Sequence, residues 1–332
     1  MQNLITGIFL SVFLTFIFIK LFSKFALKNN LTDKPDTFRK NHIGEIPLIG
    51  GISIFIAVVF SYLLINFSSS FIFDIFLGTS VVIFFGLLDD FRPHHWILRL
   101  ASQVIASIYI ILNSNLLIES LGFVKFFGEI NTGSLANLFT VLCVIALTNA
   151  INLLDGLDGL AGTIVLIALT ALIIISGSDP MQVILIIFSV ATFLHFNLGK
   201  RKYKVFLGDA GSLGLGFFLS WVLIYYSSSG LIESQQIIWF TSIPIIDTLR
   251  VMIERFKNGD KLFAADRKHL HHLLLDANMN KTLVLVIIIG LYSSLIIFGQ
   301  FMSNFLPEYS YYAFLIVTLI YISFTGRIQN KN

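Results

Sequence analysis

The sequence is a succession of long apolar runs separated by short polar connections. Eleven of these runs approach or reach the roughly 20 residues that a helix needs to cross a membrane. Their approximate limits are residues 3–23, 46–66, 71–88, 97–113, 135–151, 160–176, 180–197, 211–227, 236–253, 282–302 and 309–326. We therefore predict an all-α polytopic membrane protein with about eleven transmembrane helices, folded as one transmembrane domain over residues 1–332.

Composition agrees with this fold class and excludes several others. Only 12% of the residues are charged and 56% are hydrophobic, whereas about 25% of a soluble domain is charged. The single cysteine, Cys143, has no disulfide partner and is interpreted as a small core residue. An ordinary cytosolic enzyme, a disordered chain, a collagen-like repeat and a disulfide scaffold are therefore excluded, and we expect a lipid bilayer and no nucleic acid as partner.

The distribution of charge predicts the orientation of the spans. If the N-terminus lies outside, 21 of the 22 Lys and Arg residues lie at inner faces and only Lys125 lies outside. The inner half then carries about +8 and the outer half about −5, which is the bias expected of cytoplasmic loops. The first apolar run precedes its lysines and has no cleavage pattern, so we expect a retained anchor and not a signal peptide. The C-terminus is then expected in the cytoplasm.

With this topology, acidic residues and histidines gather at the cytoplasmic ends of spans or in cytoplasmic loops. They are Asp89, Asp90, Asp155, Asp158, Asp209, His269, His271 and His272. Carboxylates beside apolar helices are costly, and they usually face a cavity, a metal or a partner. Any one of these residues could simply cap a helix or lie at the interface. Their convergence from independent segments on one face indicates a shared polar site.

The third span ends in adjacent carboxylates at Asp89 and Asp90. Adjacent carboxylates repel one another, which raises the pKa of one of them unless a cation intervenes. The pair suits a divalent metal, or a base that removes a proton from a substrate. An acidic helix end paired with Arg92 is the structural alternative.

A second polar stretch, residues 149–162, contains Asn152, Asp155 and Asp158 at intervals of three residues. In helical geometry these side chains would form one stripe. Three glycines with the same spacing leave room for a closely packed helix or a nucleotide. A packing seam with a solvated acidic end is the alternative interpretation.

A third segment places four cations, from residues 200–204, before a glycine-rich turn around Asp209 that opens a span. Backbone N–H groups at a helix start favour anions, and Asp209 could hold Mg²⁺ that bridges phosphate oxygens. The cations could equally serve only to retain the loop inside. No G-x-x-x-x-G-K-[ST] pattern is present, so a nucleoside triphosphatase is not indicated.

The largest inner loop combines Arg255 and other basic residues with His269, His271 and His272. Imidazole and guanidinium groups could bind a diphosphate by charge-assisted hydrogen bonds. A zinc site is less well supported, because the loop has no cysteine and no H-E-x-x-H pattern. An interfacial helix, with leucines toward lipid and polar residues toward head groups, is the structural alternative.

Three other features have simpler interpretations. Asp247 in the ninth span is expected to form a structural ion pair with Arg250, and Pro244 is expected to loosen the helix there. The basic loop of residues 33–42 could contact a phosphate or only secure the topology. The outer loop, residues 114–134, is expected to form a short hairpin without a catalytic set.

Five motifs in this order resemble the polyprenyl-phosphate N-acetylhexosamine-1-phosphate transferase family. They read RKNHIGEIPLIGG, GLLDDFRP, NAINLLDGLDGLAG, KVFLGDAGSLGLGF and DRKHLHH. The resemblance is strongest to the bacterial branch that uses GlcNAc-1-phosphate, because the branch that transfers phospho-MurNAc-pentapeptide has three consecutive histidines. Residues 261–266 depart from the Ser-Pro-Phe-like run of many relatives, which leaves the hexosamine open, with FucNAc and QuiNAc as alternatives.

The resemblance implies a role for each candidate residue. Asp89 and Asp90 would serve the lipid phosphate, with Asp89 as candidate base. Mg²⁺, for which Mn²⁺ could substitute, would be held at Asp209 with Asp155 close by. Asn152 and Asp158 would shape the nucleotide pocket. The sugar diphosphate would be engaged by Arg255, His269, His271 and His272.

The resemblance also implies substrates and a location. An oxygen of undecaprenyl phosphate would attack the β-phosphorus of a UDP-N-acetylhexosamine and release UMP, and we favour direct attack over an aspartyl-phosphate intermediate. The reaction would start O-antigen, enterobacterial common antigen or teichoic acid linkage synthesis at the cytoplasmic face of the bacterial plasma membrane, and it leaves room for a homodimer. A secondary transporter is the competing class, but transporter sites lie near the midplane and reach both faces. A non-enzymatic scaffold would not explain the density of carboxylates.

Overall fold

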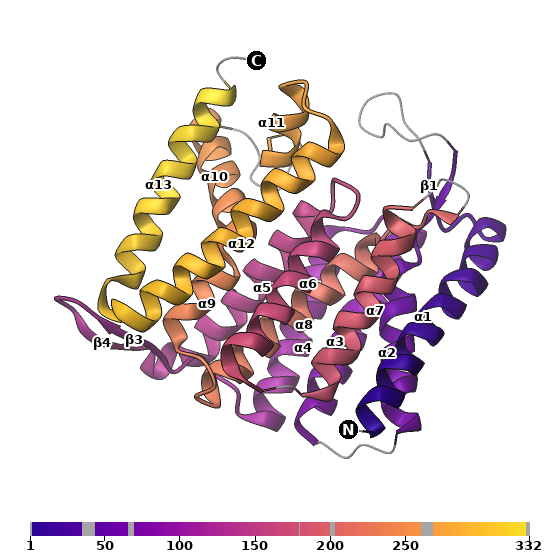
Figure 1. Cartoon of the computed structure of the whole chain (residues 1–332), viewed down its shortest axis with the longest axis horizontal. Helices are drawn as coiled ribbons and strands as arrows, with labels where there is room; N and C mark the ends of the chain where they lie inside the picture. Colours follow the sequence, from indigo (N-terminus) through magenta and orange to yellow (C-terminus); the bar gives the residue numbers. More distant parts are fainter. Residues whose placement is uncertain are drawn as a thin grey trace.

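The protein is described by a computed structural model that covers residues 2–34, 44–65, 70–178, 180–199, 203–259 and 268–329. Its helices lie side by side in one bundle, with α1 and α2 at one edge and α12 and α13 at the other (Figure 1). They are α1 (Gln2–Lys28), α2 (Gly50–Leu64), α3 (Ser70–Phe91), α4 (Trp96–Ser114), α5 (Ala136–Leu154), α6 (Leu160–Ser176), α7 (Met181–Asn197), α8 (Gly208–Ser228), α9 (Ser234–Phe240), α10 (Ser242–Asn258), α11 (Leu270–Asp276), α12 (Lys281–Phe305) and α13 (Ser310–Gln329).

The helices overlie all eleven predicted apolar ranges, and the ninth range is divided between α9 and α10. Within the described ranges, six helices are long and apolar enough to cross a membrane, or seven if the bent α9–α10 pair is one span. They are α1, α4, α5 with the turn before it, α8, α12, and α13 with the turn before it. The shorter apolar helices α2, α6 and α7 have 15 to 17 residues. The protein is therefore a mostly helical, multi-pass membrane protein, and the count of eleven spans stays a prediction.

The ninth range bends by 70° between α9 and α10. The break falls at Thr241, and Pro244 lies in the first turn of α10. Proline has no N–H to donate and is tolerated in the first turn of a helix but not in its interior. The expected loosening near Pro244 is thus a sharp bend, which ends α9 and starts α10 in a new direction.

Helix α8 forms the core of the bundle and packs against α2, α3, α5 and α6. Its large side chains Phe217, Phe218 and Trp221 are all fully buried. At its start the contact with α2 is made by backbone, because a Cβ added at Gly51 would lie 2.0 Å from the Cα of Gly211. Small residues permit such close approach of apolar helices. The glycines of the sequence therefore place the start of α8 deep among its neighbours.

Short backbone pairings fix the connections at the two ends of the bundle. Strands β1 (Thr32–Asp33) and β2 (Ile46–Pro47) pair antiparallel. The segment that leads into α8 joins them, since the Phe206 N–H donates to the Pro47 carbonyl over 2.9 Å. Between β1 and β2, residues 35–43, which include most of the predicted basic loop of residues 33–42, lie outside the described residues.

The loop of residues 114–134 forms the expected hairpin. Strands β3 (Ser120–Val124) and β4 (Gly128–Asn131) pair antiparallel, with an irregular register between Ser120 and Phe123. The Lys125 ammonium at its tip lies 3.1 Å from the carboxylate of Glu308. Helix α1 begins at the same end of the bundle as this hairpin, and α13 ends at the opposite end, beside α11 (Figure 1).

Candidate functional site

The end of α3 is bonded to the start of α8 through Asp90. Its two carboxylate oxygens accept hydrogen bonds from the backbone N–H groups of Asp209 and Ala210, over 2.8 and 3.0 Å. Gly208, which has φ +75°, leaves the space for Asp90, because a Cβ there would lie 2.7 Å from a carboxylate oxygen. The N–H groups that the sequence analysis assigned to a ligand anion are therefore used by the protein's own carboxylate. Asp90 therefore holds the end of α3 to the start of α8, and its predicted role toward the lipid phosphate stays a prediction.

Asp89 and Asp209 share one guanidinium, although they come from α3 and α8. Nη1 of Arg99 lies 2.6 Å from Oδ2 of Asp209 and 3.2 Å from Oδ2 of Asp89. The other Asp89 oxygen accepts a hydrogen bond from the backbone N–H of His94 over 2.6 Å. Two aspartates far apart in the sequence are thereby brought to one point.

Arg99 was missed by the sequence analysis, although a signal for it existed. It is the only charged residue within the apolar range 97–113, and it lies in the first turn of α4. A cation inside an apolar helix normally has an anionic partner. Applying that rule to cations as well as to carboxylates would have placed Arg99 with the aspartates.

Asn152 joins the same point from the last turn of α5. Its side-chain N–H₂ donates to Oδ1 of Asp209 over 2.9 Å and to the hydroxyl of Ser212 over 2.8 Å. Both acceptors lie in the first turns of α8, so Asn152 fixes α5 against that end of α8. Ser212 is a second site residue that the sequence analysis did not select.

The predicted helical stripe of Asn152, Asp155 and Asp158 is wrong. Helix α5 ends at Leu154, and the chain turns before α6, whose N-cap residue Gly159 has φ +80°, a conformation that favours glycine. Asp158 therefore lies in the turn and not on the helix. Its Oδ2 is 2.6 Å from the ammonium of Lys204, which precedes α8.

Asp155 is the first residue after α5, and among the site carboxylates it has the fewest polar partners. Its carboxylate has no hydrogen bond and no ion pair with any other residue in the described ranges. Burial raises the pKa of Asp155 well above its ordinary value, and the nearby carboxylates of Asp209 and Asp90 raise it further. The site therefore has an excess of negative charge that Arg99 and Lys204 do not neutralise.

The histidine segment reaches this site through His271. The His271 side chain is fully buried, and a Cβ added at Gly156 would lie 2.4 Å from its Nε2. The His272 ring lies beside it, with ring centroids 4.1 Å apart. His271 thus packs on the turn between Asp155 and Asp158, where only glycine leaves it room.

Two predicted ligand-binding residues lie elsewhere. Nδ1 of His269 is 2.8 Å from Oδ2 of Asp247, so His269 faces a different carboxylate from those of the site. Arg255 is buried within α10. The predicted pairing of Asp247 with Arg250 is confirmed, with 3.3 Å between Oδ1 and Nη2. The basic residues 200–202 and the loop of residues 261–267 lie outside the described residues.

The acidic residues of the site are candidate ligands for a metal ion. Among the described residues, no three His, Cys, Asp or Glu side chains are placed together as a metal cage, and this applies to zinc as well as magnesium. Mg²⁺, however, is usually held by one or two carboxylates together with substrate phosphates. Asp155 lies near Asp209, has a raised pKa and has no described polar partner. Its carboxylate oxygens are therefore available to a magnesium ion that also binds substrate phosphates. The residues therefore fit Mg²⁺ and offer little for a zinc site.

Fold and site together define the class: a multi-pass helical membrane protein with an acidic site at one end of its central helix. The chain matches the family model of glycosyl transferase family 4 over residues 72–227. That match runs from α3 to α8 and includes all five site aspartates, Asp89, Asp90, Asp155, Asp158 and Asp209.

Curated relatives extend the similarity over most of the chain. The chain is 32% identical to the undecaprenyl-phosphate alpha-N-acetylglucosaminyl 1-phosphate transferase of Escherichia coli O157:H7, over 94% of this chain and 88% of that protein. It is 33% identical to the protein of that name from Yersinia pestis, over 92% and 86% of the two chains. For the Pasteurella multocida protein the identity is 34%, over 82% and 78%. The chain therefore belongs to the polyprenyl-phosphate N-acetylhexosamine-1-phosphate transferase family that its motifs resemble.

Proposed function

We propose that the protein transfers GlcNAc-1-phosphate from UDP-GlcNAc to undecaprenyl phosphate and releases UMP. The observation that carries this proposal is the convergence of Asp89, Asn152 and Asp209 around Arg99 at the start of α8. This convergence lies within the segment that matches the family model. The names of the relatives supply the lipid acceptor and the sugar.

In the proposed reaction, an oxygen of undecaprenyl phosphate attacks the β-phosphorus of UDP-GlcNAc. A new P–O bond forms to the lipid phosphate, and the bond from the β-phosphorus to the bridging oxygen breaks, so UMP leaves. Direct attack needs no covalent enzyme intermediate, and positioning and charge neutralisation carry most of the catalysis in phosphoryl transfer. The protein has to bring two anions together and hold them in line.

Asp89 and Arg99 are suited to the lipid phosphate. Asp89 is held by the His94 N–H and by Arg99, which fixes its carboxylate as the acceptor for a proton on a monoprotonated phosphate. Arg99 has guanidinium N–H groups beyond the one that contacts both aspartates, and a guanidinium can bind phosphate oxygens in a bidentate manner. Asp90, bonded to α8, keeps its neighbour Asp89 in place.

Asp209 and Asp155 would hold Mg²⁺, for which Mn²⁺ could substitute. The ion would neutralise the diphosphate and stabilise the UMP leaving group. Asn152 orients the Asp209 carboxylate by its hydrogen bond to Oδ1. The carboxylate is therefore held in one orientation for binding a ligand. Asp155 contributes a carboxylate without another described partner.

The donor is proposed to lie between the turn after α5 and the histidine segment. Asp158 and Asn152 would border the nucleotide, and His271, His272, His269 and Arg255 would engage the diphosphate and sugar. The packing of His271 on Gly156 supports this arrangement, because it brings the histidine segment to the turn that carries Asp155 and Asp158.

We further propose eleven spans, an outer N-terminus and an active site at the cytoplasmic face of the bacterial plasma membrane. The positive-inside distribution supports this orientation. Because α1 begins and α13 ends at opposite ends of the bundle (Figure 1), the number of crossings is expected to be odd. The product, a lipid diphosphate sugar, would start O-antigen, enterobacterial common antigen or teichoic acid linkage synthesis, and a homodimer is compatible with these roles.

The test is release of UMP by the purified protein from UDP-GlcNAc, undecaprenyl phosphate and Mg²⁺. UMP and undecaprenyl-diphosphate-GlcNAc should appear in equal amounts, and neither should appear without the lipid acceptor. A panel of UDP-N-acetylhexosamines in the same assay identifies the sugar. Transport of substrate into sealed vesicles without UMP release would overturn the proposal in favour of a transporter.

A further inference from the structure

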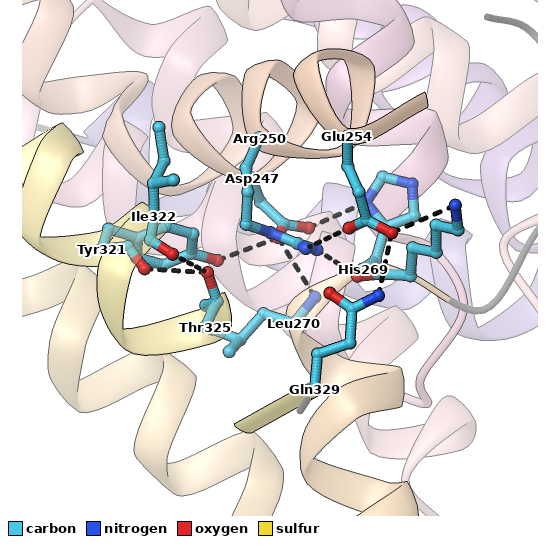
Figure 2. Close-up of polar contacts among 10 residues, drawn as sticks. Asp247, Arg250, Glu254, His269, Leu270, Tyr321, Ile322, Thr325 and Gln329 are labelled. Carbon is cyan, nitrogen blue, oxygen red and sulfur yellow. Dashed lines mark hydrogen bonds and ion pairs between the residues drawn. The ribbon is translucent and has the colours of Figure 1, made fainter. Parts of the chain in front are cut away.

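A second cluster of charged side chains lies where α10, the start of α11 and α13 meet (Figure 2). We name it the Asp247 cluster, and it comprises Asp247, Arg250, Glu254, Lys268, His269, Tyr321 and Gln329. Its centre is Asp247, whose side chain is fully buried. None of these residues belongs to the acidic site around α8, although the histidine segment begins here.

Asp247 accepts hydrogen bonds from more partners than an ion pair requires. Oδ1 accepts from the Tyr321 hydroxyl over 2.9 Å and from the Leu270 N–H over 3.1 Å. Arg250 contributes Nη2 at 3.3 Å to the same oxygen. The other carboxylate oxygen, Oδ2, lies 2.8 Å from Nδ1 of His269. A buried carboxylate is stable only when its oxygens are satisfied in this way.

The cluster also secures the chain just before His269. Arg250 donates to the backbone carbonyl of Lys268 and to the carboxylate of Glu254. Glu254 in turn contacts the Lys268 ammonium over 3.0 Å and accepts from the Gln329 amide over 2.8 Å. Residues 268–270 are thus tied to α10 and α13 by both backbone and side chains.

The contact with Asp247 determines how His269 is presented. A carboxylate at Nδ1 keeps the proton on that nitrogen, so Nε2 of the neutral ring is an acceptor, and Nε2 of the charged ring is a second donor. Nε2 is buried and has no hydrogen-bond partner among the described residues. It is therefore available to a substrate group.

His269 is also connected to the acidic site through stacked rings. The His269 and His271 rings are nearly parallel, with centroids 6.1 Å apart, and His271 packs on Gly156. A shift of His269 would therefore move the face of the histidine segment that meets the Asp155–Asp158 turn.

We propose that Asp247 and Tyr321 are positioning residues, which fix His269 and through it hold the segment 269–272 against the turn after α5. In this way α13, at the C-terminal end of the chain, contributes to donor binding without touching the donor. The inference rests on the proposed function only in taking the ligand to be the UDP-sugar.

The matched test compares two buried tyrosines. Tyr321→Phe removes the hydroxyl that bonds to Asp247, and Tyr292→Phe removes an equally buried hydroxyl that bonds to the Phe240 carbonyl. Hydrogen exchange of residues 268–276 should accelerate roughly tenfold in Tyr321→Phe and stay unchanged in Tyr292→Phe, because only the first loosens the histidine segment. Asp247→Asn is a second variant of unchanged volume and should accelerate exchange at least as much.

Kinetics provide the functional readout. Tyr321→Phe should raise the KM for UDP-GlcNAc roughly tenfold and leave the KM for undecaprenyl phosphate unchanged. In a His269→Ala background, Tyr321→Phe should add little, because the hydroxyl acts through His269. A merely structural hydroxyl would give additive effects and would move both KM values alike.

Different results would refute the proposed function and the positioning role of Asp247 and Tyr321. If the wild-type protein releases no UMP, the proposed function fails, and hydrogen exchange still decides whether Asp247 and Tyr321 hold the histidine segment. If Tyr321→Phe matches Tyr292→Phe in exchange and in donor KM, the positioning role is refuted whatever the reaction is.

Discussion

Asp90→Asn separates the structural role of Asp90 from the chemical role expected of an aspartate beside Asp89. The Asp90 carboxylate accepts two backbone N–H groups at the start of α8, over 2.8 and 3.0 Å. Leaving a buried N–H without an acceptor costs about 1–3 kcal/mol. Asparagine keeps one oxygen acceptor and places an N–H₂ group against the second N–H, so one of the two hydrogen bonds is lost and the other is weakened. Burial and the Asp209 carboxylate raise the pKa of Asp90 to about 8, so asparagine relieves little buried charge at neutral pH, and we expect a loss of about 2 kcal/mol.

The assay is thermal unfolding in detergent, run beside UMP release. A loss of about 2 kcal/mol should lower Tm by about 3 °C, because the unfolding entropy of a chain of 332 residues is about 0.7 kcal/mol/K. The control is Asp89→Asn, which leaves the α8 amides satisfied and should abolish turnover with a smaller change in Tm. If Asp90→Asn unfolds like the wild type while its turnover is abolished, Asp90 acts on the substrate, and its assignment as the group that holds α3 to α8 is refuted.

Three other perturbations test the site. Arg99→Met should reduce kcat/KM by at least about 100-fold, because it removes the cation shared by Asp89 and Asp209; unchanged UMP release would remove it from the site. Gly156→Ala should raise the KM for UDP-GlcNAc, since its Cβ would overlap His271, whereas Gly290→Ala, with open space around its Cβ, should behave as wild type in the same assay. The raised pKa of Asp155 means that a proton competes with Mg²⁺, so the rise in Tm caused by Mg²⁺ should shrink as the pH falls through that pKa. Without Mg²⁺, stability should decline as the pH rises from the ordinary aspartate range toward the raised pKa, because the folded state binds the proton more tightly; a Tm increment independent of pH would contradict the assignment of Asp155.

The sequence by itself determined the fold class and the family. Apolar runs must become helices in a bilayer, since a chain without water has to satisfy its backbone groups internally, and helices overlie every predicted range. The order of five polar motifs pointed to one family, which the relatives bear out over most of the chain. Local patterns also predicted the outer hairpin and the pairing of Asp247 with Arg250.

The prediction from residue spacing was wrong at the point where helix α5 ends. The spacing of Asn152, Asp155 and Asp158 is compatible with a helical stripe, but α5 ends at Leu154 and only Asn152 lies on it. Glycine punctuates the stretch, and the competing turn conformation at Gly159 prevails over the threefold spacing. Gly156, one of the three glycines interpreted as room for a helix or a nucleotide, is the one that allows His271 to pack there.

Only the tertiary structure decided which side chains meet. Asp90 bonds to amides 119 and 120 residues further along the chain, and Arg99 lies 110 residues from Asp209. Such partners depend on how closely α8 approaches α2 and α3, which is set by backbone contact at Gly51 of α2 and at Gly86 of α3. Sequence patterns report which face of a helix is apolar, but the depth and rotation at which helices pack decide whether a carboxylate binds a ligand, caps a helix or holds a histidine.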